Sequence, residues 1–526
     1  MKFPAGLPIG ESWIETSDRA PVVFPYDGSA VADAPVGDVE LARRSIDHAV
    51  GVRETVGRLP SYLRRKVLQS VHSAVLAERD AFVDLLVLET GKPMIDCRVE
   101  IDRTLLTLET SAEEVARLHG ETVPLDLLPS GEGLQGFWVR KPIGVVVGIT
   151  GFNYPLLLAA HKVAPAFAAG CPIIVKPAPQ TPLATLWLVH LMRSALADAG
   201  APESAVQLIT GGSDVGATLT TDGRIGAVSF TGSAAVGHRI ARDAAPTKVL
   251  LELGSNSALV VAEDADLDAA ADAIIRGGYY ASGQACISVQ RVIAVESVRE
   301  ALLERLGARL PAVVVGDPRD PDTRVSALIN PQSTERVRTW VEDAVRAGAT
   351  IAYGAPGTSE SATAAEVPGG DVLGPIAEGA PGATIAYGAP GTASSESATS
   401  PEVPGGAVLG PIVLTDVPDG QLAWDEEIFG PVIAVRSVPD VASALRVVNE
   451  TRYGLHASVF TSSLETAFAA IDRLEVGGVV INDVPGFRSD VMPYGGVKDS
   501  GTGREGPRFA IEELTTTRMA IIRPRP

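Results

Sequence analysis

The sequence predicts an α/β protein built around a doubly wound, mostly parallel sheet. Between about residues 143 and 262, short apolar runs alternate with stretches of helical length, so that strand, crossover and strand repeat in order. The apolar runs are IGVVVGI, CPIIVK, AVQLIT, IGAVSF and KVLLEL. Parallel strands joined by helices are covered on both faces, and ligands bind beyond their carboxyl ends. Functional residues are therefore expected in the loops that follow these strands.

Length and charge narrow the class of protein. The 526 residues are enough for two or more domains, and a net charge of −20 argues against nucleic acid or an anionic membrane as a partner. Every run of 18 residues is interrupted by a charged residue, His or Pro, so no membrane span is predicted. The start, MKFPAGLPIGESWIE, lacks the pattern of a secretory signal. We expect a reducing, cytoplasmic environment, free thiols at Cys97, Cys171 and Cys286, and no metal site.

The flanking regions also carry patterns. Residues 37 to 118 have helical apolar spacing, and a second alternating region follows Cys286, beginning with SVQRVIAVES and VREALLERLGARL. A segment at 348 to 376, GATIAYGAPGTSESATAAEVPGGDVLGPI, recurs with small changes at 382 to 412. Two copies are too few for a solenoid. We expect one copy to supply ordinary strands and the other an added excursion rich in Gly, Pro, Ser and Thr.

Three strand-to-helix loops hold candidate functional residues. Asn153 follows GVVVGITG, just before a proline suited to the first turn of a helix. Lys176 ends the run CPIIVK. Gly232 and Ser233 follow AVSF, where free backbone N–H groups can bind a phosphate. The alternative for this turn is a simple helix N-cap by Ser233.

Two further residues have chemistry that depends on their surroundings. Glu252 ends the run LLEL, and burial there would raise its pKa toward that of a useful general base. The alternative is a surface carboxylate at a strand end. Cys286, in GQACISVQRV, is either a nucleophile or an inert packing thiol, since free cysteines are usually buried and unreactive. Taken singly, Glu252 and Cys286 favour the structural alternative. Asn153, Lys176, Glu252 and Cys286, however, follow in this order and all lie at loop edges of the predicted sheet, which favours a shared site.

At this point the sequence resembles the aldehyde dehydrogenase superfamily along nearly its whole length. The matching stretches, in order, are PIGVVVGITGFNYP, IIVKPAPQTP, VSFTGSAAVG, LELGSNS, GQACISVQR, EEIFGPV and MPYGGVKDSGTGREG. The resemblance implies that Cys286 attacks an aldehyde carbonyl, and that the Asn153 amide and the Cys286 backbone N–H bind the resulting oxyanion. Hydride loss leaves a thioester, which a water activated by Glu252 then cleaves.

The resemblance also implies NAD or NADP as cofactor. Lys176 is expected at the adenosine ribose, Gly232 and Ser233 at the pyrophosphate, and Glu427 and Phe429 at the nicotinamide ribose and ring. Glu427 has an alternative as a helix-cap carboxylate. The remaining expected cofactor contacts are Thr150, Phe152, Val236 and Leu253.

Two positions depart from the family pattern. Members that prefer NAD commonly have an acid where this chain has Pro179, so the choice between NAD and NADP stays open. Ser255 stands where a second glycine is usual, and its side chain either crowds the nicotinamide or points away.

For the substrate, the resemblance implies Arg103, His161 and Tyr494 as contacts and a small polar or anionic aldehyde, such as a lactaldehyde, a semialdehyde, or a phosphono- or sulfo-aldehyde. Arg103 would pair with the substrate anion; the alternative is an ion pair with Glu100 or Asp102. Anion-selective members often have Arg where this chain has Ala285, which weakens the phosphonate reading. Arg488 is a further candidate cation with no clear role.

Three other functions fit the sequence less well. A CoA-acylating relative usually lacks the general base, and a cysteine hydrolase or acyltransferase without nicotinamide has no need of Lys176, Glu427 or the pyrophosphate turn. A silent binding relative should have lost Cys286 or Glu252. The resemblance implies an aldehyde dehydrogenase-like architecture and a homodimer or homotetramer. The expected parts are a dinucleotide-binding domain at 1–121 and 143–255, an α/β catalytic domain at 256–498, and a small β oligomerisation arm at 122–142 and 499–526.

Overall fold

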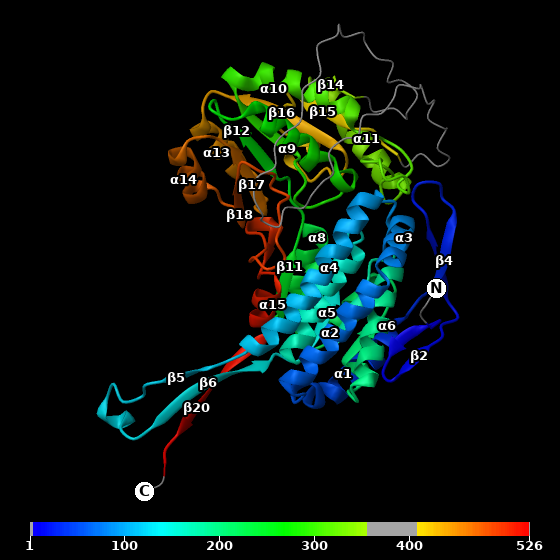
Figure 1. Cartoon of the computed structure of the whole chain (residues 1–526), viewed down its shortest axis with the longest axis vertical. Helices are drawn as coiled ribbons and strands as arrows, with labels where there is room; N and C mark the ends of the chain where they lie inside the picture. The colour runs from blue at the N-terminus through cyan, green and yellow to red at the C-terminus, as the bar shows by residue number, and fades with distance from the viewer. Residues whose placement is uncertain (1–3, 355–407, 525–526) are drawn as a thin grey trace.

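The computed structural model describes residues 4–354 and 408–524. It has two lobes, each built on a sheet, and a long arm that projects from one of them (Figure 1). No helix among the described residues is long and apolar enough to cross a membrane.

The first lobe contains a six-stranded sheet in which all strands but the short edge strand β19 are parallel. In spatial order the strands are β19 (Gly501–Thr502), β11 (Lys248–Glu252), β10 (Ile225–Thr231), β7 (Val145–Ile149), β8 (Ile173–Lys176) and β9 (Val206–Leu208). The chain winds outward from β7 through β8 to β9 and then returns to β10 and β11 on the other side. The winding therefore reverses between β7 and β10, which is where doubly wound sheets bind ligands.

Helices enclose this sheet, and residues 37 to 118 are largely helical as predicted. The helices of the lobe are α1 (Val39–Gly57), α2 (Ser61–Ala77), α3 (Arg79–Thr90), α4 (Met94–Glu114), α5 (Pro155–Ala169), α6 (Leu183–Asp198), α7 (Ser213–Thr221), α8 (Ala234–Asp243) and α15 (Pro507–Glu513). Every residue of α5 is buried, because α5 lies against β7 and β8 on one side and against α2, α4 and α6 on the other.

The second lobe contains a seven-stranded sheet that is parallel except for the edge strand β14. Its strands, in spatial order, are β14 (Thr350–Tyr353), β15 (Ile412–Thr415), β16 (Val432–Val438), β13 (Arg291–Val295), β12 (Ala258–Val261), β17 (His456–Phe460) and β18 (Gly478–Ile481). Its helices are α9 (Leu267–Tyr279), α10 (Glu296–Arg309), α11 (Pro331–Arg346), α12 (Leu422–Asp425), α13 (Val441–Asn449) and α14 (Leu464–Arg473). Separate apolar clusters cover the two faces of this sheet.

The duplicated segment meets the second sheet at both of its ends. Strand β14 lies in the first copy, whereas β15 begins at the last residue of the second copy. The expectation that one copy supplies both strands is therefore wrong for the described part. The physical reason is that the second copy runs on into the apolar strand IVLT, whereas the first continues as IAEG. The rest of both copies, residues 355–407, lies outside the described residues.

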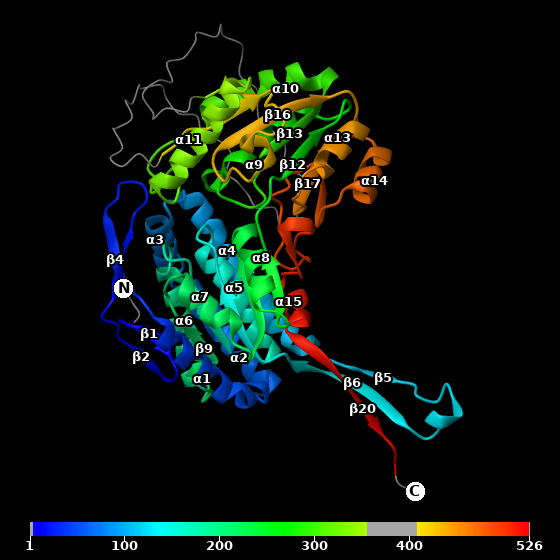
Figure 2. The same ribbon diagram turned by 180° about the vertical axis from the view of Figure 1, so that it is seen from behind.

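The arm is a three-stranded antiparallel sheet of β5 (Glu121–Val123), β6 (Gln135–Pro142) and β20 (Thr515–Ile522). It extends away from the first lobe, and β20, the last strand, runs along it (Figure 2). Residues 499–514, which we expected in the arm, lie elsewhere. Strand β19 pairs with β11, and α15 packs on α4 and α5, where Ile511 and Leu514 join the core. The arm therefore takes only β20 from the C-terminal segment.

Two hairpins near the N-terminus complete the first lobe. They are β1 (Leu7–Ile9) with β2 (Ser12–Ile14), and β3 (Arg19–Val23) with β4 (Ala30–Pro35). Leu7, Ile9 and Val22 are buried in the same core as the six-stranded sheet, which fixes both hairpins to this lobe.

Candidate active site

A cavity of about 710 Å³ lies between the lobes. This volume is within the usual range for small-molecule sites. The first lobe contributes the segments that follow the carboxyl ends of β7, β8, β10 and β11, and the second contributes the loops that precede β13 and β16. All residues predicted for catalysis, cofactor and substrate line this one cavity: Arg103, Thr150, Phe152, Asn153, His161, Lys176, Gly232, Ser233, Val236, Glu252, Leu253, Cys286, Glu427, Phe429 and Tyr494.

Cys286 lies in the turn before β13, after two residues with left-handed backbone, Ala281 at φ 49° and Ser282 at φ 56°. Its Sγ is 3.2 Å from the hydroxyl of Tyr494. Burial raises the pKa of the Cys286 thiol to about 11, although the Tyr494 hydrogen bond acts in the opposite direction. The thiol is therefore protonated at neutral pH in this state. Cys97 and Cys171 are also free but are fully buried outside the cavity.

Asn153 occupies the turn between β7 and α5. Its Nδ2 donates a hydrogen bond of 2.8 Å to the carbonyl oxygen of Gln284, two residues before Cys286. An amide nitrogen carries two protons, so one remains for another acceptor. The turns that hold Asn153 and Cys286 are therefore joined directly, although they come from different lobes.

Glu252 is the last residue of β11 and is buried. Burial raises its pKa well above the usual value, and the nearby carboxylate of Glu505 adds to this rise. Its Oε2 has no hydrogen-bond partner among the described residues. The predicted rise in pKa is confirmed, and the alternative of a surface carboxylate is wrong because the loops around β19 cover the end of β11.

The remaining strand ends form a surface suited to a dinucleotide. Burial lowers the pKa of Lys176, and the charge of Asp214 partly opposes that shift. Ser233 occupies the N-cap position of α8 but makes no capping hydrogen bond through its side chain. The capping role offered as an alternative for Ser233 is therefore absent here. The first-turn N–H groups of α8 can instead face an anion.

Glu427 and Phe429 enter the cavity from the second lobe. Glu427 accepts a 2.9 Å hydrogen bond from the backbone N–H of Ser255, and burial raises its pKa to about 7. It binds this strand-end loop, not the N-terminus of a helix, so the helix-cap alternative is wrong. The Phe429 ring meets the Phe152 ring edge to face at 5.7 Å. The acceptor groups and aromatic edges of this end fit the ribose and ring of a nicotinamide nucleotide.

Ser255 points away from the cavity. Its hydroxyl is 3.2 Å from that of Ser257, and both side chains line a separate, very small pocket. The Ser255 side chain therefore does not crowd the main cavity. Gly254 lines the cavity instead, and a Cβ there would lie 2.3 Å from Glu427 Oε2.

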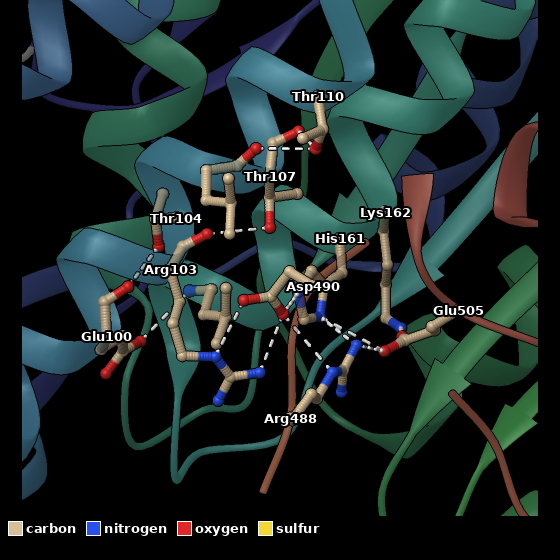
Figure 3. A network of polar contacts seen from close by, with 12 residues as sticks. Glu100, Arg103, Thr104, Thr107, Thr110, His161, Lys162, Arg488, Asp490 and Glu505 are labelled. Carbon is tan, nitrogen blue, oxygen red and sulfur yellow. Dashed lines mark hydrogen bonds and ion pairs between the residues drawn. The ribbon is translucent and has the colours of Figure 1, made fainter. Parts of the chain in front are cut away.

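A buried cluster of charged side chains lies beside the cavity, and its members contact one another (Figure 3). Asp490 lies at its centre, where it accepts two hydrogen bonds of 2.9 Å from Arg103 and is 3.0 Å from His161 Nε2. Burial alone would raise the pKa of Asp490, but the charge of Arg103 and these hydrogen bonds hold it well below the usual value. Asp490 does not itself line the cavity, whereas Arg103, His161 and Arg488 do. From outside the cavity, the Asp490 carboxylate thus holds the side chains of Arg103, His161 and Arg488 in place.

Glu505 is the second carboxylate of the cluster. It contacts His161 Nδ1 at 3.2 Å, Arg488 Nη2 at 3.1 Å and Lys162 Nζ at 3.3 Å. Despite burial, the charges of Lys162 and its other partners keep the pKa of Glu505 well below the usual value. The Arg488 guanidinium also lies 3.6 Å from the ring centre of Tyr494. The cluster therefore connects directly to the residue that contacts Cys286.

Arg103 pairs with Asp490, and not with Glu100 or Asp102 as the sequence left open. Glu100 pairs with Lys92 inside the protein, and Asp102 points outward and pairs with Arg79. The alternative that Arg103 pairs with Glu100 or Asp102 is therefore wrong, because neighbours on a helix face different directions. Its Nη1 makes no hydrogen bond within the described part of the chain.

Sequence reasoning missed several residues that support the site: Lys92, Asp96, Glu100, Lys162, Asp490 and Glu505. Charged side chains are usually solvated, so Asp96 and Glu100 on α4 and Lys92 in the loop before it gave no signal of burial. Glu505 and Lys162 lie within or next to motifs already singled out, GTGREG and GFNYPLLLAAHK. No group of side chains suited to a metal ion occurs among the described residues.

The fold and cavity together define an α/β protein of the doubly wound class, with Cys286 in the lining of a cavity between its two lobes. The family model described as "Aldehyde dehydrogenase family" matches residues 13–367 and 380–520. The chain is 34% identical over 518 residues to the 3-sulfolactaldehyde dehydrogenase of Priestia megaterium, covering 98% of each chain. It is 31% identical to the lactaldehyde dehydrogenase of Methanococcus aeolicus, covering 98% and 99%.

Solved structures agree. Aldehyde dehydrogenase 21 of Physcomitrella patens, crystallised with the product succinate, gives a TM-score of 0.87 at 31% identity, covering 99% of this chain and 98% of that one. Glyceraldehyde-3-phosphate dehydrogenase GapN of Methanocaldococcus jannaschii, complexed with NADP, gives 0.84 at 30% identity, covering 97% and 100%. Betaine aldehyde dehydrogenase of Staphylococcus aureus, complexed with NAD⁺, gives 0.87 at 26% identity, covering 100% and 96%. The chain belongs to the aldehyde dehydrogenase family.

Proposed function

We propose that the protein oxidises a small aldehyde carrying a polar or anionic group to the carboxylic acid, with NAD or NADP as cofactor. The observation that carries this proposal is the shared cavity of Cys286, Asn153 and Glu252, with Arg103 and Arg488 at one end and the dinucleotide-type strand ends at the other. The relatives fit this substrate class, because their names include a sulfolactaldehyde and a lactaldehyde dehydrogenase.

In the proposed reaction, the Cys286 sulfur attacks the aldehyde carbonyl carbon and the carbonyl oxygen becomes an oxyanion. The thiol first has to lose its proton, because the thiolate is the nucleophile. The second N–H of the Asn153 side-chain amide and the backbone N–H of Cys286 are the donors proposed for the oxyanion. The nicotinamide supplies a hydride acceptor when the cofactor is bound.

Loss of hydride from the former aldehyde carbon would convert this adduct into a thioester on Cys286, which must then be hydrolysed. Glu252 is the proposed base that takes a proton from the attacking water. A raised pKa suits this role, since a carboxylate with an ordinary pKa is a weak base at neutral pH. Because Glu505 raises the pKa of Glu252, the charge cluster also sets the pH at which the base becomes active.

The charge cluster favours an anionic or strongly polar substrate group. Arg103 and Arg488 line the cavity near Tyr494, and Asp490 keeps them in place from outside it. Guanidinium groups with free donors bind carboxylate, sulfonate or phosphate groups. Ala285, next to Cys286, adds no positive charge to the cavity, whereas an Arg at that position would. The smaller number of cations favours a singly charged or hydroxylated substrate over a phosphonate.

We further propose that the protein assembles as a homodimer or homotetramer in a reducing, cytoplasmic compartment. The arm presents exposed apolar side chains along β20, with Ile521 at 62% and Ile522 at 47% exposure. Helix α14 exposes Leu464, Phe468 and Ile471 at helical spacing beside the edge strand β18. Such surfaces mark contacts between chains. The free state of the three cysteines fits a reducing compartment.

A spectrophotometric screen at about 340 nm tests the function. Short aldehydes with carboxylate, sulfonate, phosphonate, hydroxyl or alkyl groups are incubated with the enzyme and either NAD or NADP, with and without CoA. The expected result is CoA-independent reduction of the nucleotide with the polar and anionic aldehydes. Strict dependence on CoA, or ester hydrolysis without any aldehyde oxidation, would contradict the proposal. The Cys286→Ala variant is the control for background reduction.

A further inference from the structure

Helix α4 carries two fully buried carboxylates that do not line the cavity. Asp96 and Glu100 are four residues apart, so they lie on the same face of the helix about 6 Å apart along its axis. Buried carboxylates are costly unless they are paired or hydrogen-bonded. Each carboxylate accepts hydrogen bonds from backbone N–H groups in a different loop of the active site.

Glu100 holds the turn that carries Asn153. Its Oε1 accepts hydrogen bonds from the backbone N–H groups of Leu156, at 2.9 Å, and Leu157, at 3.1 Å, in the first turn of α5. It thereby caps α5, whose own N-cap residue makes no side-chain cap. Its Oε2 binds the Nζ of Lys92, which is also buried.

Lys92 completes the clamp. Its Nζ donates a 2.8 Å hydrogen bond to the backbone carbonyl oxygen of Asn153, and it lies 3.7 Å from the ring centre of Tyr154. The backbone of the Asn153 turn is therefore held on both sides by one ion pair. The side chain of Asn153 is free to point the other way, toward Gln284.

Asp96 holds the turn that carries Cys286. Its Oδ2 accepts a 3.0 Å hydrogen bond from the backbone N–H of Ala281. Ala281 and Ser282 both have left-handed backbone, a strained conformation for residues with a side chain, and such conformations persist only where the surroundings fix them. The hydroxyl of Ser282 is fixed in turn by the backbone of Ser326.

We propose that Asp96 and Glu100, with Lys92, are positioning residues that set the spacing between the Asn153 amide and the Cys286 thiol. Helix α4 binds the loop of Asn153 through Glu100 and the loop of Cys286 through Asp96. These two carboxylates lie about one helical turn apart on α4, so the helix fixes the distance between the two loops. This inference rests on the proposed roles of Asn153 and Cys286. It assigns no contact with substrate to Asp96, Glu100 or Lys92.

The test is a double-mutant cycle on the first-turnover rate of nucleotide reduction. Asn153→Ala is expected to slow this step about 10²- to 10³-fold, and Glu100→Gln about 10- to 100-fold through misplacement of the amide. In the Asn153→Ala background, Glu100→Gln is expected to cause less than about a twofold further loss, because its effect acts through the missing amide. The KM for the cofactor should stay within about twofold of that of the wild type.

Multiplicative losses in the cycle would overturn the inference and leave the proposed function intact. An Asn153→Ala variant with normal first-turnover rate would instead overturn the proposed role of Asn153. Asp102→Asn is the matched control, since Asp102 lies on the same helix but is exposed and pairs with Arg79; it should retain the wild-type rate. If Glu100→Gln does not fold because Lys92 is left unpaired, Lys92→Met/Glu100→Gln removes both charges and should show the same non-additivity with Asn153→Ala.

Asp96 has a separate readout. Alkylation of Cys286 by iodoacetamide involves no oxyanion, so it reports the thiol and not the Asn153 amide. Asp96→Asn is expected to change the alkylation rate by about threefold or more, while Glu100→Gln leaves it within about twofold, in line with the separate turns that the two residues hold. Equal effects of both variants on alkylation, or none from Asp96→Asn, would contradict the assignment of one carboxylate to each turn.

Discussion

At the scale of single residues, the site depends on how neighbours set protonation. Burial raises the pKa of Cys286 and of Glu252, whereas Asp490 and Glu505 stay ionised because cations surround them. Glu505 and Glu252 are both buried carboxylates, yet their pKa values move in opposite directions. The difference arises because Lys162, His161 and Arg488 contact Glu505, while Glu252 Oε2 lacks a partner among the described residues.

The raised pKa of Cys286 predicts how the free enzyme reacts with iodoacetamide. Since the thiolate is the reactive form and the pKa is about 11, the alkylation rate should keep rising between pH 7 and pH 10 without reaching a plateau. Peptide mapping by mass spectrometry should find the label on Cys286 and not on the buried Cys97 or Cys171. A plateau below about pH 8.5, the ordinary range of a free thiol, would show that the thiol is not held in its protonated form.

Glu505→Gln predicts a shift in the pH dependence of the steady-state rate. Glu252 acts as a base only when ionised, so the rate should rise with pH through its raised pKa. Removing the negative charge of Glu505 lowers that pKa, and the rising limb should move toward acid pH. Glu512→Gln, at a half-buried carboxylate of the neighbouring helix α15 that pairs with Arg508, should leave the profile unchanged. A shift toward alkaline pH would contradict the proposed coupling.

At the scale of elements, strands and helices deliver residues to the cavity from two directions. The carboxyl ends of β7, β8, β10 and β11 face the amino ends of β13 and β16. The rule that ligands bind beyond carboxyl ends predicted the first set, and it could not predict Cys286, Glu427 and Phe429, which precede their strands. Cys286 stood out in the sequence only as a possible nucleophile, and the family resemblance supplied its role together with Glu427 and Phe429. The alternation of apolar runs predicted all five parallel strands of the first sheet, because buried parallel strands are apolar on both faces.

The arm gives a prediction at this scale. Ile521→Asp/Ile522→Asp places two charges on the exposed apolar edge of β20, where association would bury them. The assembly should dissociate to smaller species with at least about a tenfold weaker association, because burial of an unpaired charge is costly. Sedimentation velocity measures this. Leu76→Asp, at an exposed site on α2 outside the arm, serves as the control and should retain the assembly of the wild type. An unchanged sedimentation coefficient for the β20 variant would exclude the arm from the interface.

At the scale of the whole molecule, residues from distant parts of the chain meet around one cavity. The charge cluster and helix α4 provide the contacts between these segments. Asp490 comes late in the chain, and Arg103 and His161 come from two helices of the first lobe. Asp96 and Glu100 extend the same pattern of contacts between distant segments. These pairings span most of the chain, so local patterns in the sequence contain no trace of them.

The duplicated segment gives a prediction for the whole chain. The copies are offset by 34 residues, counted as 382 minus 348, so deletion of residues 354–387 joins Tyr353 to Gly388 and leaves one copy between β14 and β15. Both described strands keep their sequences, and every described residue that lines the cavity is retained. The variant should keep its activity within about twofold, since a change in the length of the connection between two strands costs little free energy. A folded but inactive variant would contradict the expectation that one copy is dispensable.

The sequence alone determined the parallel strands, the helical regions, the order of the motifs and, through them, the family. Periodicity and strand-end chemistry are local, so they can be read without knowing which segments meet. The tertiary structure decided which partner Arg103 takes, which carboxylates are ionised, and that α4 binds the turns of Asn153 and Cys286. These features depend on burial and on charges brought together from distant parts of the chain, and only the folded molecule determines those distances.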